Sequence, residues 1–181
     1  MSENIKGYNK NLNPERIKKI KMILTDVDGV LTDGSLMLGD GELELKSFNV
    51  HDGFAIYLAK RAGLKVGFIT GRTSRAVERR AKELGIDVLY QGELNKRIPY
   101  EKVKSEYELD DDEIAFIGDD FLDLVILKKV GFSASVANAR EEVKRHVHYV
   151  TSAKGGDGAF REIIDLILKE KGLWEDVTGS F

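Results

Sequence analysis

The sequence predicts an α/β fold in which a parallel sheet lies between two layers of helices, a three-layer Rossmann-like arrangement. Short apolar runs alternate with segments of helical length from residue 20 to residue 171. Several apolar runs are too hydrophobic to face water on either side, which is typical of buried parallel strands. Glycines end several of the expected helices. The length of 181 residues suits one domain with one core.

The expected elements divide the chain into a lead-in segment (residues 1–19), one domain (20–172) and a C-terminal tail (173–181). In the lead-in, the Asn13-Pro14 pair is typical of a capped helix start. Asp52 is expected to cap the first helix of the domain and Gly63 to end it. The predicted strands are residues 20–27, 65–69, 87–90, 113–117, 132–135 and 147–150. The predicted helices are residues 52–63, 73–84, 98–107, 121–129, 139–146 and 159–171.

A β-hairpin insert at about residues 34–48 interrupts the alternation of strands and helices. Two segments of alternating polarity, residues 35–38 and 43–48, flank the sequence Gly39-Asp40-Gly41. Such a glycine-rich acidic turn between alternating segments is a strong hairpin pattern.

The composition excludes several classes of function. The formal net charge is −3 at pH 7, so no basic field is present that would hold nucleic acid. The chain has no cysteine, which removes disulfides, zinc–thiolate sites and thiol nucleophiles. It also has no signal-peptide core and no run of about 18 apolar residues. We therefore expect a cytoplasmic protein that binds neither nucleic acid nor membrane.

Acidic residues follow two of the predicted strands. Asp26 and Asp28 stand two residues apart after the first strand, and both point the same way if that strand persists through them. The sequence GDDFLD, residues 118–123, follows the strand at 113–117. Taken alone, each aspartate is an ordinary turn former or helix cap. Because four or five carboxylates at one edge of a sheet repel one another, a cation such as Mg²⁺ is expected between them.

The other two loops at this edge carry Thr70-Gly71-Arg72 and Lys96. A hydroxyl, a backbone amide beside a glycine and a lysine are the groups that hold a phosphoryl oxygen during attack on phosphorus. Individually, Lys96 is also compatible with a solvated surface lysine and Thr70 with a helix cap.

The four loops together resemble the motifs of the haloacid dehalogenase superfamily of phosphotransferases. The motifs are DVDGVLTD, ITGR, the segment around Lys96 and GDDFLD, and the match runs from residue 20 to about residue 123. More narrowly, the hairpin in place of a large cap domain and the segments FNVHDGFAI, QGELNK and GGDGAFRE are similar to the family of 3-deoxy-D-manno-octulosonate 8-phosphate phosphatases. This resemblance implies the haloacid dehalogenase fold and Mg²⁺-dependent hydrolysis of that phosphomonoester in lipopolysaccharide precursor synthesis.

The resemblance also implies a role for each loop. Asp26 would attack phosphorus to form an aspartyl-phosphate, and Asp28 would protonate the departing sugar oxygen and then activate water. Thr70 and Lys96 would hold the transferring phosphoryl group. The ligands of Mg²⁺ would be the side chains of Asp26 and Asp119 and the backbone carbonyl of Asp28, supported by Asp120 or Asp123.

By the same resemblance, the rest of the substrate would contact residues on three loops. These residues are Asp28, Asn49, Val50, His51, Asp52, Gly53, Arg72, Arg80 and Lys96. Asp52 remains equally suited to cap a helix, and Arg80 to be a surface charge. His51, His146 and His148 lack partners at metal-ligand spacing and are expected to be structural or surface residues.

The resemblance further implies a homotetramer, in which a neighbouring subunit covers the site that no cap domain covers. The hairpin carries Leu36, Leu38, Leu43 and Leu45, which would expose apolar surface unless another surface covered them. The alternative is that the hairpin folds back on its own domain.

Three other functions remain open at this point. The chain could act on a related nonulosonate phosphate or another sugar phosphate, which differs only at a few substrate-binding positions. It could be a catalytically silent oligomerisation domain, although the complete set of Asp26, Asp28, Thr70, Lys96 and Asp119 argues against silence. A phosphate-binding receiver domain also uses acidic strand ends and a lysine, but the Asp-x-Asp-Gly sequence and the hairpin fit it badly.

Overall fold

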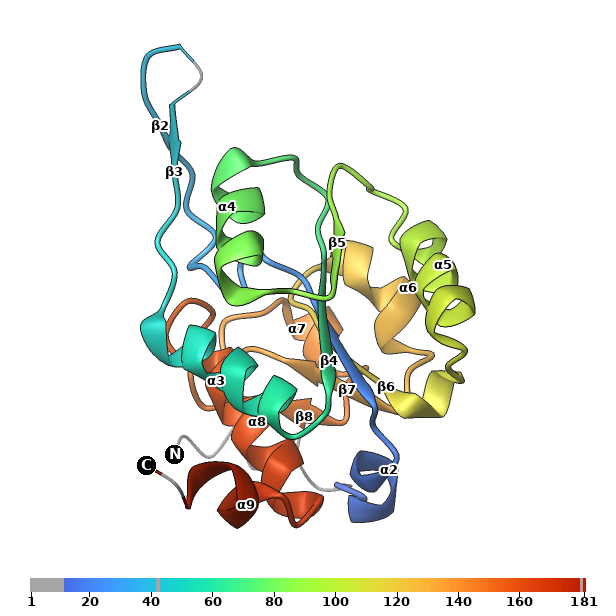
Figure 1. Cartoon of the computed structure of the whole chain (residues 1–181). Helices are drawn as coiled ribbons and strands as arrows, with labels where there is room; N and C mark the ends of the chain where they lie inside the picture. Colours follow the sequence, from blue (N-terminus) through green and yellow to red (C-terminus); the bar gives the residue numbers. More distant parts are fainter. Residues whose placement is uncertain (1–11, 42, 180) are drawn as a thin grey trace.

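The computed structural model describes residues 12–41, 43–179 and 181, so that residues 1–11 of the predicted lead-in lie outside the described part. Six parallel strands form the central sheet in the order β5-β4-β1-β6-β7-β8 (Figure 1). The strands are β1 (Met22–Thr25), β4 (Lys65–Ile69), β5 (Val88–Tyr90), β6 (Ile114–Ile117), β7 (Phe132–Ser135) and β8 (Tyr149–Val150). The predicted α/β class and parallel sheet are confirmed.

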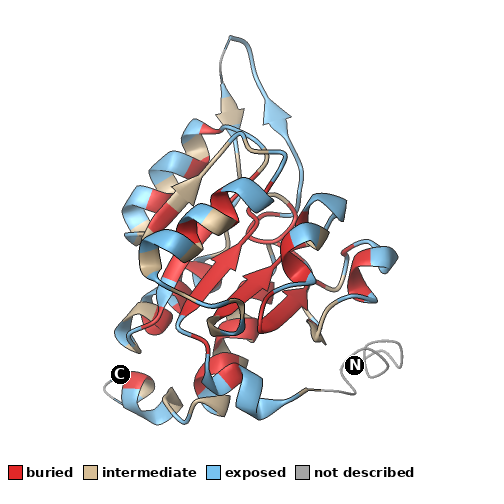
Figure 2. Cartoon of the chain, turned by 90° about the vertical axis from the view of Figure 1, so that its right-hand side faces the viewer, coloured by how far each residue is buried: buried red, intermediate tan, exposed pale blue. Residues whose placement is uncertain are grey.

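Helices cover both faces of this sheet, because successive strand residues point to opposite sides. In β1, Ile23 packs with α3, α4 and α8, whereas Met22 and Leu24 pack with α5, α6 and α7. Figure 2 shows the strands as the buried centre of the molecule. The helices are α2 (Pro14–Lys18), α3 (Val50–Arg61), α4 (Arg75–Leu84), α5 (Arg97–Tyr107), α6 (Leu124–Leu127), α7 (Glu141–Lys144), α8 (Ala159–Glu170) and α9 (Trp174–Thr178).

Most predicted elements occur, several of them with shorter bounds. The predicted helix at 121–129 is a 3-10 turn, Phe121–Asp123, followed by the four residues of α6. The start of α2 is as predicted, since Asn13 accepts a hydrogen bond from the amide of Glu15 at 3.0 Å and Pro14 is the first helical residue.

The predicted cap of α3 is wrong. Asn49, in an extended conformation, caps the helix by accepting the amide of His51 at 2.8 Å. Asp52 lies in the first turn, and its Oδ1 accepts the amide of Arg161 in α8 at 2.8 Å. Because Gly158, the residue before α8, has no side chain to cap that helix, the carboxylate from α3 satisfies an amide of its first turn instead.

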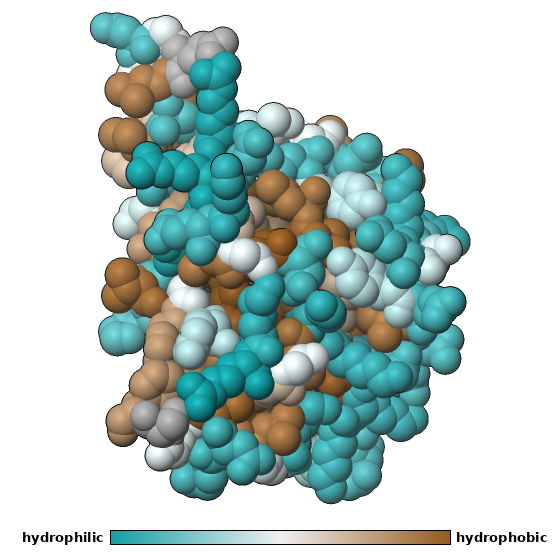
Figure 3. Space-filling model, viewed as in Figure 1, coloured by the Kyte–Doolittle hydropathy of each residue, from teal (hydrophilic) through white to brown (hydrophobic). Residues whose placement is uncertain are grey.

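The predicted hairpin is present and projects from the domain as β2 (Met37–Leu38) and β3 (Glu44–Leu45) (Figure 1). Apolar side chains lie along it (Figure 3), and Leu38 is 71% exposed and Leu45 53% exposed. The base of β3 contacts α4, but the described part of the hairpin does not fold back onto the sheet.

Asp52 predicts a specific dependence of stability on pH. Burial raises its pKa to about 6, although the backbone amides of Arg161 and Gly158 favour the charged form. The folded chain therefore holds the proton of Asp52 more tightly than the unfolded chain, so this contribution to stability is complete below about pH 4 and is lost as the pH rises through about 6. Asp52→Asn removes this titration and retains an oxygen acceptor.

We expect the free energy of unfolding of the wild type, measured relative to Asp52→Asn, to fall by about 1–3 kcal/mol between pH 4 and pH 7. Urea unfolding of both proteins at several pH values measures this difference. A difference that does not change with pH, or that grows as the pH rises, would contradict the assignment.

Candidate active site

The candidate site lies at the carboxyl edge of the sheet, where β1 runs between β4 and β6. The central sheet continues from β1 to β4 on one side and from β6 to β7 on the other, so the strand order reverses between β1 and β6, which is where ligands bind in open parallel sheets. Asp26 follows β1 directly, and its amide donates to the carbonyl of Ile117, the last residue of β6, at 2.9 Å. The backbone pairing of two neighbouring strands thus fixes the position of the Asp26 carboxylate.

A buried ion pair joins Lys96 to Asp26. Lys96 stands just before α5, yet its side chain is only 1% exposed, so the alternative of a solvated surface lysine is wrong. Its Nζ lies 2.9 Å from Oδ2 of Asp26 and 2.6 Å from Oδ1 of Asp123. Burial lowers the pKa of Lys96, but the charges of Asp123 and Asp26 outweigh burial and hold this pKa above its ordinary value.

Asp119 completes a cluster of three carboxylates with Asp26 and Asp123, in which one oxygen of each lies within 4.8 Å of the others. The oxygens of Asp123 are occupied, Oδ1 by Lys96 and Oδ2 by the amides of Asp119 and Asp120 at 2.9 and 3.2 Å. In contrast, Oδ1 of Asp119 is buried and has no hydrogen-bond partner among the described residues.

This cluster fits a divalent cation. Burial, together with the charges of Asp26 and Asp123, raises the pKa of Asp119 to about 8. Three carboxylates face one ammonium, which leaves two negative charges uncompensated. A hard cation with oxygen ligands, such as Mg²⁺, would neutralise them and would occupy the free oxygen of Asp119. Asp26 and Asp119 are the side chains available to hold it, while Asp123 supports them through Lys96 and the two amides.

Asp28 does not join this cluster. The expectation that Asp26 and Asp28 point the same way required the strand to continue, but β1 ends at Thr25. The carbonyl of Val27 then accepts the amides of three residues, Val30, Leu31 and Thr32, at 2.9–3.3 Å, so the chain turns sharply. The Asp28 carboxylate bonds Nζ of Lys46 instead.

Lys46 and Glu44, both from the hairpin, are site residues that the sequence reasoning missed. The side chain of Lys46 is fully buried, and its Nζ also lies 3.5 Å from Glu44. Arg72 adds a second cation, at 3.7 Å from Glu44 and 4.0 Å from Asp28. The alternation in the sequence ELELK could have indicated these two residues. Period-two geometry puts Glu44 and Lys46 on one face of the strand and the leucines on the other.

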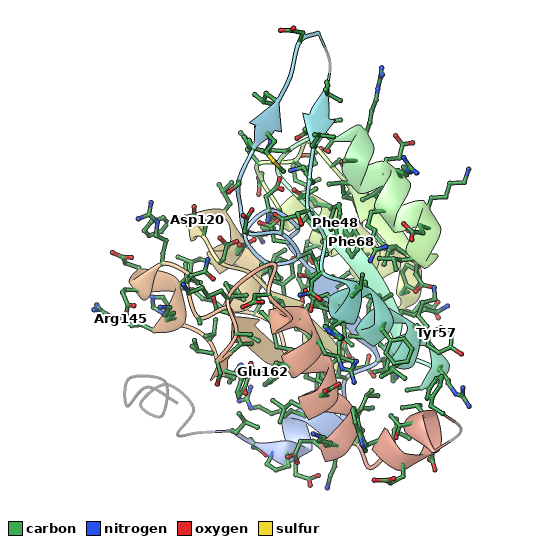
Figure 4. All side chains as sticks on the ribbon, turned by 90° about the vertical axis from the view of Figure 1, so that its left-hand side faces the viewer. Phe48, Tyr57, Phe68, Asp120, Arg145 and Glu162 are labelled. Carbon is green, nitrogen blue, oxygen red and sulfur yellow. The ribbon has the colours of Figure 1, made fainter. Side chains whose placement is uncertain are left out.

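Thr70 and Asp120 are the remaining loop residues, and their surroundings differ. Thr70 directly follows β4, is buried, and donates its amide to the carbonyl of Tyr90 at 2.9 Å. Because β4 pairs with β1, Thr70 and Asp26 follow the carboxyl ends of neighbouring strands. Asp120 instead accepts the amide of Phe121 at 2.7 Å and caps the following 3-10 turn (labelled in Figure 4). Of the two aspartates expected to support the metal site, Asp123 joins the cluster through its side chain, whereas Asp120 contributes its backbone amide to Asp123.

The expected substrate segment at residues 49–53 does not lie in the carboxylate cluster. Asp52 bonds α8, Val50 is 74% exposed, and Gly53 packs against Arg80. The guanidinium of Arg80 lies over the ring of Phe48, 5.8 Å from its centroid, and NH1 bonds Glu83 at 3.0 Å. Phe48 and Phe68 lie together behind this segment (Figure 4), where they line a small enclosed space with Asn49.

The three histidines are surface or structural residues, as expected, and His146 is exposed after α7. His51 is exposed at the start of α3, and Nδ1 of His148 lies 2.8 Å from the hydroxyl of Ser133 on β7, a structural contact.

The residues beside α4 form a groove of about 590 Å³, lined by Leu43, Leu45, Phe48, Arg75 and Arg79 among others. Glu44 and Lys46 also line this groove, and Lys46 connects it to Asp28 through their ion pair.

Comparison with known proteins places these features in a family. The model of the haloacid dehalogenase-like hydrolases matches residues 86–163. The 3-deoxy-D-manno-octulosonate 8-phosphate phosphatase KdsC of Yersinia pestis is 40% identical over 165 residues, which make up 91% of this chain and 88% of the relative.

Solved structures agree with this match. A phosphatase of the same name from Moraxella catarrhalis, in complex with a magnesium ion, a phosphate ion and a KDO molecule, has a TM-score of 0.90 and 36% identity, with 93% of this chain and 97% of that chain covered. The cobalt-bound deoxy-D-mannose-octulosonate 8-phosphate phosphatase of Haemophilus influenzae has a TM-score of 0.84 and 39% identity, with 87% and 92% covered. Structures of this kind therefore bind metal ions.

Among the described residues, no helix is both long and apolar enough to cross a bilayer.

The free oxygen of Asp119 predicts its effect on metal binding. Asp119→Asn should weaken Mg²⁺ binding by about tenfold or more, about 1.4 kcal/mol, because an amide oxygen replaces a charged ligand. Isothermal titration calorimetry on metal-free protein measures this without any assay of activity. The matched control is Asp120→Asn, which changes the adjacent cap and should bind Mg²⁺ like the wild type. Equal affinities for Asp119→Asn and the wild type would exclude Asp119 as a ligand.

Proposed function

This chain belongs to the family of 3-deoxy-D-manno-octulosonate 8-phosphate phosphatases within the haloacid dehalogenase-like hydrolases, and from that premise we propose that it hydrolyses this eight-carbon sugar acid phosphate to the free sugar acid and phosphate. As a member of this family it is a phosphoric monoester hydrolase. The observation that carries the proposal is the buried contact of Lys96 with Asp26, beside the unpartnered oxygen of Asp119.

In the proposed mechanism, a carboxylate oxygen of Asp26 attacks phosphorus and the bond between phosphorus and the sugar oxygen breaks. Asp28 gives a proton to that oxygen, so the sugar leaves as an alcohol. Asp28 then takes a proton from a water molecule, whose oxygen attacks phosphorus and releases Asp26 and inorganic phosphate. Lys96 and Thr70 hold the phosphoryl oxygens in both steps. Bound Mg²⁺, held by Asp26, Asp119 and the carbonyl of Asp28, supplies positive charge against the phosphoryl oxygens.

The residues beside Asp28 supply the charge that a sugar acid requires. Lys46, whose side chain is buried, and Arg72, which is half-exposed, place two cations beside Asp28, and the groove beside α4 is lined by further arginines. A carboxylate on the substrate is complementary to these cations, whereas a neutral sugar phosphate is not. The proposed substrate contacts therefore centre on Arg72 and Lys46, and the segment at 49–53 supports the loops behind them.

The second candidate is the same reaction on a related nonulosonate phosphate, which carries a carboxylate of the same kind. The charges around Asp28 suit both sugar acids. A silent oligomerisation domain is disfavoured, because it would have no use for a buried lysine between two buried aspartates, an arrangement that is costly unless both partners are present.

An assay of phosphate release tests the proposed activity. We expect the eight-carbon sugar acid phosphate to be hydrolysed fastest in a panel of sugar phosphates, with activity abolished by EDTA and restored by Mg²⁺. Asp26→Asn should lower kcat by more than about 100-fold, about 2.7 kcal/mol, because an amide is a poor nucleophile.

The matched control for Asp26→Asn is Asp33→Asn in the turn that follows β1, since Asp33 is exposed and its carboxylate accepts hydrogen bonds from Ser35, two residues away. It should retain wild-type kcat. An Asp26→Asn protein that keeps more than about a tenth of the wild-type kcat would exclude the covalent route.

We also propose a homotetramer in which the hairpins pack together. The support is the exposed apolar face of the hairpin and the open site, since an aspartyl-phosphate must be protected from stray water. A neighbouring copy would supply this cover. We include residues 179–181 of the neighbouring copy in this cover; of these, Ser180 lies outside the described residues.

Replacement of Leu36 and Leu38 by Asp should yield smaller species, because charge on the hairpin opposes its packing against another copy. Light scattering measures the mass. Activity towards the sugar acid phosphate should fall more than activity towards p-nitrophenyl phosphate, which needs only the residues of one subunit. Ile98→Asp is the control, since Ile98 has a similar exposure, 46% against 43% for Leu36, but lies on α5. A wild type that is monomeric and fully active would refute the arrangement.

A further inference from the structure

Gly155 and Gly156, in the loop between β8 and α8, lie directly against the turn that follows β1. The amide of Gly156 donates to the carbonyl of Val30 at 2.9 Å. A Cβ atom on Gly155 would overlap the carbonyl oxygen of Gly29, and one on Gly156 would overlap the amide of Asp33. Only glycine allows the two backbones to approach so closely. The resemblance to known phosphatases included the sequence GGDGAFRE, but the proposed reaction gives it no role.

The opposite side of the same turn faces the carboxylate cluster. A Cβ atom on Gly29 would overlap Oδ2 of Asp119, so the turn backbone touches that carboxylate. The turn therefore lies between Asp119 on one side and Gly155 and Gly156 on the other. Asp28, whose carbonyl is the proposed third ligand of Mg²⁺, immediately precedes Gly29. Any outward shift of Gly155 would leave space for Gly29 and Asp28 to move away from Asp119.

The segment from Asn138 to Arg140 contacts both the glycine loop and Asp119. Asn138, after β7, accepts the amide of Gly155 at 2.9 Å, and two residues later the amide of Arg140 donates to the carbonyl of Asp119 at 3.1 Å. The carboxylate of Asp52 holds the far end of the glycine loop through the first turn of α8. The Gly155–Gly156 backbone is thus fixed relative to Asp119 without contacting the carboxylates itself.

We infer that Gly155 and Gly156 are positioning residues that set the distance between the Asp28 backbone and Asp119, and with it the affinity of the site for Mg²⁺. The inference rests on the proposed function for the identity of the metal. Because protein interiors are close-packed, a side chain at Gly155 displaces the backbone it meets rather than finding free space. Because the turn lies between Gly155 and Asp119, this displacement changes the position of Gly29, and of the adjacent Asp28 backbone, relative to Asp119.

The test compares Gly155→Ala with Gly131→Ala. A Cβ atom on Gly131 would overlap the backbone of Asp112 in the same way, but Gly131 precedes β7 and so lies at the amino edge of the sheet, away from the site. Both variants should melt at lower temperature than the wild type. Calorimetric titration with Mg²⁺ should show an affinity loss of about tenfold or more for Gly155→Ala alone, as is typical when residues that support metal ligands are changed.

A milder variant, Asn138→Ala, keeps the inference testable if Gly155→Ala does not fold. It removes only the exposed side chain that holds the Gly155 amide, and it should weaken Mg²⁺ binding several-fold at unchanged mass and helicity. Wild-type Mg²⁺ affinity in folded Gly155→Ala, or in Asn138→Ala where the first does not fold, would overturn the inference, as would an equal loss in Gly131→Ala. Failure of the proposed function has a different result, namely no release of phosphate by a wild type that still binds Mg²⁺.

Discussion

The site depends on one buried ammonium group, that of Lys96. It lies between Asp26 and Asp123, and without it two buried carboxylates would face each other and Asp119 uncompensated. Removing one partner of such a buried pair typically costs about 3–5 kcal/mol. Asp123 extends the effect, because its other oxygen binds the amides at 119 and 120. The lysine before α5 thus fixes the loops after β1 and β6 relative to each other, and the remaining negative charge is what suits the site to a divalent cation.

The hairpin contributes to the site through one face of a single short strand. Glu44 and Lys46 point inwards, where Lys46 bonds the Asp28 carboxylate, while Leu43 and Leu45 stay more than half exposed. The alternation of β3 therefore separates a charged contact within the chain from an apolar surface outside it. A long buried lysine side chain on a protruding element is costly in conformational entropy, and it is kept in place by two carboxylates and by the neighbouring Arg72.

Local sequence patterns predicted most of the helices and strands, but they could not predict contacts between segments that are distant in the sequence. Strands such as Lys65–Ile69 and Phe132–Ser135 occur at their predicted bounds, and the first of them is the kind of apolar run that is typical of buried parallel strands. The choice of Asp52 over Asn49 as a cap failed, because both residue types cap helices and the packing of α8 against α3 decides between them. Lys46 was missed for a related reason. Its partner Asp28 lies in another loop, and the hairpin sequence alone does not show which part of the domain the hairpin contacts.

The order of the strands has a consequence for the nascent chain. The first strand to leave the ribosome, β1, is central, and one of its neighbours, β6, is encoded more than halfway along the sequence. During synthesis, one edge of β1 can pair with β4 early, while the other keeps its amides and carbonyls open. The other parts of the site are synthesised later. They are, in order, the carbonyl of Ile117, which positions Asp26, then the carboxylate of Asp119 and finally the backbone of Gly155. A truncated translation product therefore carries Asp26 without Asp119 and the other residues of the carboxylate cluster, and it exposes an apolar strand edge that favours aggregation.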